Sequence, residues 1–326
     1  MSSVPCTNPM CYTVVKIRLE KGKSLTYARL IVNPVAGAGK TAKKWPQIMG
    51  LLQNMGLNFE HDITEAPGHA RELAKAAAEK GYELVVSVGG DGTINEVVNG
   101  LYDTGNMAEV TLGIIATGTG HDYIRTIGIP WAYQEACKCL QNPGKFAADL
   151  GVVEYFSGGQ MVKRLFVNFA GLGFDAEVVK TTTQKYKALS STASYLTGLF
   201  AALFFYQNKK VILTMDGEAT ERKVCTVLVS NGKYGGGGML AAPEADLTDG
   251  LLDVLIIGNI SKPDLLWSLP RVYKGTHLTH PKVSLKKARE VEIQSTEAIS
   301  LQADGELLGG LPARFYVLPG ALNVAI

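Results

Sequence analysis

The sequence predicts an α/β protein of two domains: an N-terminal doubly wound, Rossmann-like domain and a second, mainly antiparallel β-sandwich domain. Short strand-like and helix-like segments alternate in the first half of the chain, and glycine-rich loops follow several of the strands. Past Pro143, strand-like segments separated by turns dominate. The length of 326 residues is sufficient for two hydrophobic cores.

The elements of the first domain follow the order expected of a parallel sheet. Strands are predicted at residues 28–33, 58–64, 83–88 and 110–115, and helices at residues 45–55, 69–80 and 95–101. Helices between strands provide the crossovers that parallel pairing requires. An extension precedes them, in which a strand is predicted at Tyr12–Arg18 and for which the sequence indicates no function.

The second domain has two convincing helical segments, Ser191–Asn208 and Lys262–Tyr273, among many strands. The boundary is predicted near Gly144–Asp149. The resulting division is an extension at 1–26, a first domain at 27–148 and a second domain at 149–311. The tail, residues 312–326, either completes the second domain or returns to the first as a final strand.

Composition and charge limit the functional classes. Lysine plus arginine (32) nearly balances aspartate plus glutamate (30), so the net charge of +2 gives no general argument for nucleic acid binding. The five cysteines form no C-x-x-C pair and no dense disulfide pattern, which indicates free thiols in a reducing cytoplasm. The N-terminus lacks the pattern of a signal peptide, so a cytoplasmic protein is expected.

The longest apolar run is Tyr195–Tyr206, whose twelve residues are too few to span a bilayer. A buried helix of the second domain is the favoured interpretation. A helix that lies on a membrane surface is the alternative, and the neighbouring Lys209 and Lys210 support it.

Three glycine-rich loops follow predicted strands: PVAGAGK at 34–40, GGDGT at 89–93 and TGTGHD at 117–122. Ligands of open α/β sheets bind beyond the carboxyl ends of the strands, so the loops are predicted to converge on one binding edge. Glycine amides can cradle phosphate groups. Any one of these loops alone would be explained equally well as a tight connection.

Two common phosphate-binding motifs are incomplete in this chain. A Walker loop requires glycine at position 34, which is Pro34, and G-x-G-x-x-G is broken by Tyr123. Asp91, in the second glycine loop, would repel a phosphate unless a cation lay between them, which implies magnesium. The residues therefore predict a nucleotide site that is built from several loops.

Taken in order, the motifs resemble the diacylglycerol kinase catalytic domain superfamily, which includes soluble bacterial diacylglycerol kinases, phosphatidylglycerol kinases, sphingosine kinases and ceramide kinases. The motifs are NPVAGAGK, TEAPGHA, VGGDGTINEVVNGL, GIIATGTGHDYIR, NGKYGGGG, APEADLTDGLLDV and QADGE. GGDGT alone is shared with NAD kinases, but the ordered set is more specific. The resemblance covers the chain from about residue 27 to its end and implies an NAD-kinase-like first domain.

The resemblance implies ATP as the phosphoryl donor. The implied nucleotide-binding residues are Asn33, Thr64, Gly89, Gly90, Gly92, Thr93, Thr117, Gly118, Thr119 and Gly120. Asp91, Asp122 and Asp149 would form a carboxylate network that organises catalytic Mg²⁺ through water. From the residues alone, a helix N-cap is a credible alternative for Asp122, and Asp149 could equally be a turn residue.

Two distal acidic groups complete the implied site. Asp304 would deprotonate the lipid hydroxyl with Glu306 as its supporting partner, and Asp91 is counted with them as catalytic. Asp246, Asp249 and the carbonyl of Leu251 would hold a structural Mg²⁺. From the residues alone, the alternatives are a hairpin turn at Asp304 and a solvated acidic turn at 246–249.

One residue departs from the family pattern, because His121 stands where the family usually has asparagine. Histidine can donate a hydrogen bond, but it is bulkier and titrates near neutral pH. A changed substrate choice or pH dependence is one interpretation, and a tolerated neutral replacement is the other.

The sequence therefore predicts an ATP-dependent lipid kinase that acts on a membrane-lipid hydroxyl, first of all that of diacylglycerol, to give phosphatidic acid. The alternatives are an NAD kinase-type enzyme and a catalytically inactive lipid- or nucleotide-binding regulator. Peripheral membrane contact is expected, with the apolar run and Gly235–Gly238 as candidates. Nucleic acid is not expected as a partner, and a homodimer is one compatible assembly.

Overall fold

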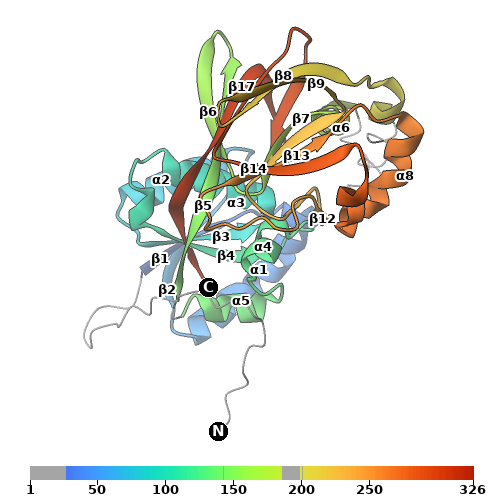
Figure 1. Ribbon diagram of the computed structural model, residues 1–326. Coiled ribbons are helices and arrows are strands. Elements are labelled where there is room, and N and C mark those ends of the chain that lie inside the picture. The colour runs from blue at the N-terminus through green and yellow to red at the C-terminus, as the bar shows by residue number, and fades with distance from the viewer. Residues whose placement is uncertain (1–26, 142, 186–198, 200) are drawn as a thin grey trace.

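The computed structural model describes residues 27–141, 143–185, 199 and 201–326, which form an α/β region and a β-rich region, one above the other in Figure 1. The predicted strand Tyr12–Arg18 lies outside the described residues. So do residues 191–198 and 200 of the predicted helix Ser191–Asn208.

The α/β region contains a parallel sheet in the order β4-β3-β1-β2. Its strands are β1 (Tyr27–Val32), β2 (Asn58–Ile63), β3 (Leu84–Gly89) and β4 (Thr111–Ala116). Its helices are α1 (Ala36–Asn54), α2 (His69–Glu79), α3 (Asp91–Tyr102), α4 (Asp122–Ile127) and α5 (Tyr133–Cys139), with the 3-10 turn η1 (Met107–Glu109). The predicted order of strands and helices is confirmed, with shifted ends.

Helix α1 begins at Ala36, well before the predicted start at Trp45. Its first turn contains three residues with left-handed backbone, Gly37, Ala38 and Gly39 (φ 61°, 57° and 82°). The prediction followed the apolar periodicity, which is visible only from Trp45 onward, and so it missed this glycine-rich turn. Helices α4 and α5 were missed because they are too short to show a period.

The β-rich region is built from antiparallel pairs. Its strands are β5 (Lys145–Ser157), β6 (Gln160–Phe166), β7 (Phe169–Gly173), β8 (Lys209–Met215), β9 (Glu218–Val224), β10 (Thr226–Ser230), β11 (Tyr234–Gly235), β12 (Met239–Leu240), β13 (Leu252–Ile257), β14 (Val283–Ala288), β15 (Glu290–Gln294), β16 (Ser300–Ala303) and β17 (Glu306–Ala325). Its helical elements are α6 (Phe174–Lys185), α8 (Lys262–Tyr273) and η2 (Thr276–Thr279). The predicted helix Lys262–Tyr273 is confirmed. Helix α6 was not predicted, because its β-branched residues, among them Val178 and Thr181, favour strands.

Two layers of strands pack face to face in this region. One layer follows the order β14-β13-β10-β7-β16, and the other contains β9, β8, β15, β17, β5 and β6. Pairing of β16 with β17 joins the layers. Leu172, Val254, Leu213, Val291 and Phe315 belong to the core between them. The predicted antiparallel β-sandwich is therefore confirmed.

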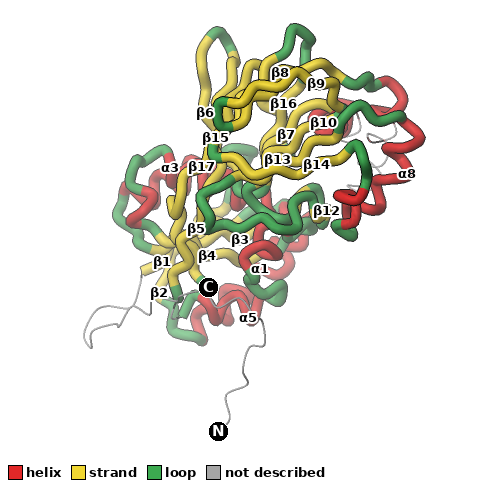
Figure 2. The backbone as a smooth tube through the Cα atoms, viewed as in Figure 1, coloured by secondary structure: helices red, strands yellow, loops and turns green. Residues whose placement is uncertain are grey.

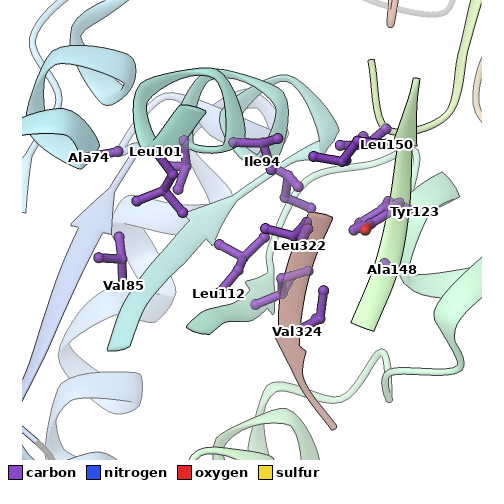
Figure 3. Packing of buried hydrophobic residues seen from close by; sticks show 14 of the residues in the cluster. Ala74, Val85, Ile94, Leu101, Leu112, Tyr123, Ala148, Leu150, Leu322 and Val324 are labelled. Carbon is purple, nitrogen blue, oxygen red and sulfur yellow. The ribbon is translucent and has the colours of Figure 1, made fainter. Parts of the chain in front are cut away.

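Strands β5 and β17 continue from the sandwich into the α/β region (Figure 1). The end of β17 pairs in parallel with β4 through Asn323 and Val324. Leu322 and Val324 pack there beside Ala148 of β5 (Figure 3). The sequence placed a domain boundary at position 148, which lies inside strand β5. The domain limits drawn from the sequence stay a prediction. Loop segments gather where the two regions meet (Figure 2).

Candidate active site

One cavity of about 570 Å³ is lined by residues of both regions. Glycine loops and the carboxyl groups of Asp91, Asp122 and Asp304 form its polar part. Its apolar part is formed by Phe174, Val178, Leu199, Leu228, Leu255, Ile257, Leu265, Leu269 and Val272. A polar site and an apolar chamber therefore share one space.

The three predicted glycine loops meet at the polar part. Gly37, Gly90 and Gly118, one from each loop, line the cavity, so the predicted convergence is confirmed. A Cβ atom on Gly118 would lie 2.5 Å from the Cα of Gly90, and one on Gly37 would lie 2.5 Å from the Thr117 carbonyl oxygen. Gly118 and Gly37 are therefore required for the loops to pack closely against each other, whether or not a ligand binds.

Most of the predicted nucleotide-binding residues face this cavity. Those that line it are Asn33, Gly90, Gly92, Thr93, Gly118, Thr119 and Gly120. Thr64, Gly89 and Thr117 do not line it. Thr117 Oγ1 instead lies 2.5 Å from Thr41 Oγ1, and the Thr64 amide donates to the Val32 carbonyl. The roles of these residues in nucleotide binding stay a prediction.

Asp91 and Asp122 come together beside Gly120, where an added Cβ atom would lie 2.5 Å from Asp91 Oδ2 and 3.4 Å from Asp122 Oδ2. Asp91 Oδ1 accepts a hydrogen bond from the Tyr123 amide at the start of α4 (3.1 Å), whereas Asp122 accepts from the amides of Gly237 and Gly238 (2.8 and 2.7 Å). The alternative of Asp122 as a helix cap is therefore wrong. Burial and the nearby Asp91 raise the pKa of Asp122. A divalent cation would relieve this repulsion, so the pair fits magnesium.

Asp149 is held apart from this pair. Its Oδ1 accepts from the Gly320 amide (2.7 Å) and its Oδ2 from the Gly250 amide (2.8 Å). Its side chain does not line the cavity. The structure thus brings together two of the three predicted network carboxylates. Asp149 instead ties β17, at Gly320, to the loop before β13.

The carboxylates of the implied structural magnesium site already have partners. Asp249 accepts from the Leu251 amide (3.0 Å) and from Lys287 Nζ (2.6 Å), and Lys287 also lies 3.3 Å from buried Asp253. Asp246 accepts from Thr248. Across the described residues, no cluster of three or more His, Cys, Asp or Glu side chains suits a metal ion. The structure pairs Lys287 with Asp249, and the structural Mg²⁺ predicted at Asp246, Asp249 and the Leu251 carbonyl stays a prediction.

We expect Lys287→Met to lower the free energy of unfolding by about 1–2 kcal/mol, since buried Asp253 would lose its cation while solvent still reaches the pair. Urea unfolding without nucleotide measures this change. Lys286→Met, an exposed neighbour on β14, is the matched control. An effect of Lys287→Met no larger than that of Lys286→Met would contradict this expectation. A magnesium-dependent rise of the unfolding midpoint that persists in Asp91→Asn would support the predicted structural metal site.

Asp304 lies in the turn between β16 and β17, with a left-handed backbone (φ 46°). Its carboxylate accepts hydrogen bonds from the amides of Val167 (2.7 Å), Asn168 (3.0 Å) and Phe169 (3.1 Å) and from Asn95 Nδ2 (2.7 Å). Burial outweighs these bonds and raises the pKa of Asp304 to about 6. The residue is a hairpin-turn aspartate, and it also lines the cavity wall; its role as a base stays a prediction.

Glu306 does not contact Asp304 directly. Its carboxylate pairs with Arg164, whose Nη2 donates to Asn95 Oδ1 (3.1 Å), and Asn95 in turn donates to Asp304. A chain through Arg164 and Asn95 therefore links the two predicted residues. Neither intermediate was singled out from the sequence. Asn95 lies inside the motif VGGDGTINE, which was an available signal, whereas nothing local marks Arg164.

His121 adopts the left-handed backbone conformation (φ 59°), which asparagine tolerates better than most residues. Its ring stacks on Trp131, with 5.4 Å between centroids, and Arg125 also lies over the Trp131 ring. Burial lowers the pKa of His121, so the neutral ring prevails at pH 7. The interpretation of His121 as a neutral replacement is favoured.

Helix α8 separates the apolar chamber from solvent. Leu265 and Leu269 line the cavity, whereas Trp267 is 81% exposed. Phe204 and Phe205 are also exposed, and Lys262 at the start of α8 lies over the Phe204 ring. Within the described part of the chain, no helix is long and apolar enough to cross a membrane.

Comparisons with known proteins agree with this geometry. The model of the diacylglycerol kinase catalytic domain matches residues 27–153, and that of the YegS C-terminal NAD kinase beta sandwich-like domain matches residues 168–326. Diacylglycerol kinase of Bacillus subtilis (strain 168) is 31% identical over 303 residues, which cover 92% of this chain and 96% of the relative. The Mycobacterium tuberculosis (H37Rv) enzyme of the same name is 30% identical over 298 residues (90% and 93%). A solved Bacillus anthracis protein of the diacylglycerol kinase type has a TM-score of 0.75 and 25% identity, over 95% of this chain and 98% of its own.

The fold and the glycine-lined cavity define a kinase in which a Rossmann-like α/β domain precedes a β-sandwich. The chain belongs to the diacylglycerol kinase family. The resemblance read from the ordered motifs is therefore confirmed.

Proposed function

We propose that the protein is an ATP-dependent lipid kinase that transfers the γ-phosphoryl group to the free hydroxyl of diacylglycerol and produces phosphatidic acid. The observation that carries this proposal is one cavity in which glycine loops, Asp304 and an apolar wall occur together. A triphosphate suits the polar part of that cavity, and acyl chains suit the apolar part.

In the proposed reaction, the Asp304 carboxylate removes the hydroxyl proton as the acceptor oxygen attacks the γ-phosphorus. A new P–O bond forms, the bond to the β–γ bridging oxygen breaks, and ADP leaves with that electron pair. The pKa of Asp304, about 6, leaves the base ionised near neutral pH and still able to accept a proton. Asn95, held by Arg164, orients the carboxylate.

Asp91 and Asp122 would hold the proposed Mg²⁺, with phosphate and water oxygens as the remaining ligands. When bound, the ion neutralises phosphate charge. Asn33 supports the loop geometry, because its Nδ2 donates to Thr93 Oγ1 (2.9 Å). Participation of Asp149 through water stays a prediction.

The proposal is tested with purified protein, labelled ATP, Mg²⁺ and mixed micelles of diacylglycerol, phosphatidylglycerol, sphingosine, ceramide or undecaprenol, with NAD offered in parallel. Labelled phosphatidic acid is the expected product. Label in NADP alone would favour an NAD kinase-type enzyme. ATP binding without product from any acceptor would favour an inactive regulator.

We also propose peripheral contact with the bilayer through the exposed aromatic residues beside the chamber. Trp267→Ser is expected to lower the fraction that sediments with phospholipid vesicles roughly threefold, because tryptophan favours the membrane interface. Ile212→Ser, at an exposed apolar position on β8, is the matched control. Equal sedimentation of the two variants would exclude Trp267 from the contact.

A further inference from the structure

A second acidic side chain, Asp175, lines the same cavity and is not used by the proposed chemistry. It lies in the first turn of α6 and reaches back over the sandwich strands. Its Oδ1 is 2.8 Å from Thr226 Oγ1 on β10, and its Oδ2 accepts from Gln302 Nε2 on β16 (2.8 Å). A Cβ atom at Gly171 would collide with Asp175 Oδ2, so the glycine in β7 makes room for this carboxylate.

Gln302 connects Asp175 to the turn that carries Asp304. Its side chain is 1% exposed, and while Nε2 donates to Asp175, Oε1 accepts from the Gly305 amide (2.9 Å). Asp304 and Gly305 both have left-handed backbone (φ 46° and 84°). Such a pair forms a tight hairpin turn, and a residue other than glycine occupies its first position only when the surroundings hold it there.

The turn is thus fixed at two points. The Asp304 carboxylate is anchored by the amides of residues 167–169, and the peptide after it is anchored by Gln302. The first anchor sets where the carboxyl group lies, and the second sets the backbone from which it projects. Asp175 determines which end of the Gln302 amide faces Gly305, since only Nε2 can donate to a carboxylate.

We propose that Asp175 and Gln302 are positioning residues that orient the Asp304–Gly305 turn toward the acceptor hydroxyl. The inference rests on the proposed function and adds to it two residues that act through Asp304. A purely structural pair would affect stability alone, whereas a positioning pair should lower kcat with little change in the KM for ATP.

The test is a reversal of hydrogen-bond polarity. Gln302→Glu still offers an oxygen to the Gly305 amide but places a second carboxylate against Asp175. We expect kcat for diacylglycerol to fall about 100-fold, the size of effect that a small misplacement of a catalytic group produces. Adding Asp175→Asn restores a donor toward residue 302, so the double variant should recover most of this loss. Gln294→Glu, the same change at an exposed position on β15, is the control.

An unchanged kcat in Gln302→Glu, or a double variant no better than the single one, would overturn the inference. If Gln302→Glu does not fold, Gln302→Met takes its place with the same expected loss. Hydrogen exchange across residues 303–306 gives a readout without lipid: it should accelerate in Gln302→Glu and slow again in the double variant. Should wild-type protein phosphorylate no lipid, the proposed function fails, and unaltered exchange would separately refute the Asp175–Gln302 link.

Discussion

Asp304→Asn is expected to lower kcat by about 10³-fold or more while ATP still binds, because the substitution removes the only proposed general base. The change is nearly isosteric, but the new amide nitrogen cannot accept the hydrogen bonds that one carboxylate oxygen accepts, so urea unfolding is measured beside activity. Steady-state kinetics with diacylglycerol micelles and calorimetric titration with ATP measure the two effects. Glu221→Gln, the same carboxylate-to-amide change at an exposed position on β9, is the control. Full activity of the Asp304 variant would show that another residue acts as the general base.

The same residue makes a pH dependence testable. Burial raises the pKa of Asp304 to about 6, so the base is protonated, and inactive, below that pH. Wild-type kcat should therefore be flat above pH ~7 and fall about tenfold per pH unit well below pH ~6. A profile that stays flat down to pH ~5 would contradict the assignment, provided that the fold persists there.

Asp91→Asn is expected to lower kcat/KM for ATP by roughly 10²–10³-fold and to raise the magnesium concentration needed for half-maximal rate. The asparagine oxygen can still accept the Tyr123 amide, so the start of α4 keeps its partner. What is lost is the negative charge beside Asp122. Rates measured over a magnesium titration at fixed ATP distinguish this loss from misfolding.

Asp149→Asn provides the comparison for the predicted carboxylate network. Both oxygens of Asp149 accept backbone amides, so a purely structural role predicts reduced stability with an unchanged magnesium requirement. A raised magnesium requirement would instead support the network of three carboxylates. An Asp91 variant that needs no more magnesium than wild type would refute the metal role proposed for Asp91.

Much of the polar part of the site could be predicted because its residues are close in sequence. Gly90, Asp91 and Thr93 follow one strand directly, and Gly118 and Asp122 follow another, so the parallel sheet brings both groups to one edge. Residues that act through distant partners left no local signal. Arg164 meets Glu306 across 142 positions, and Asp175 meets Gln302 across 127.

The sequence alone determined the alternating α/β order, the turn to antiparallel strands and the three converging loops, because periodicity, glycine spacing and motif order are local properties of the chain. Only the tertiary structure decided which charged groups share an environment. It placed Asp91 beside Asp122, hydrogen-bonded Asp149 to two backbone amides and set Lys287 beside Asp249. Strand register and loop path determine these contacts, and neither can be read from the spacing of the residues involved.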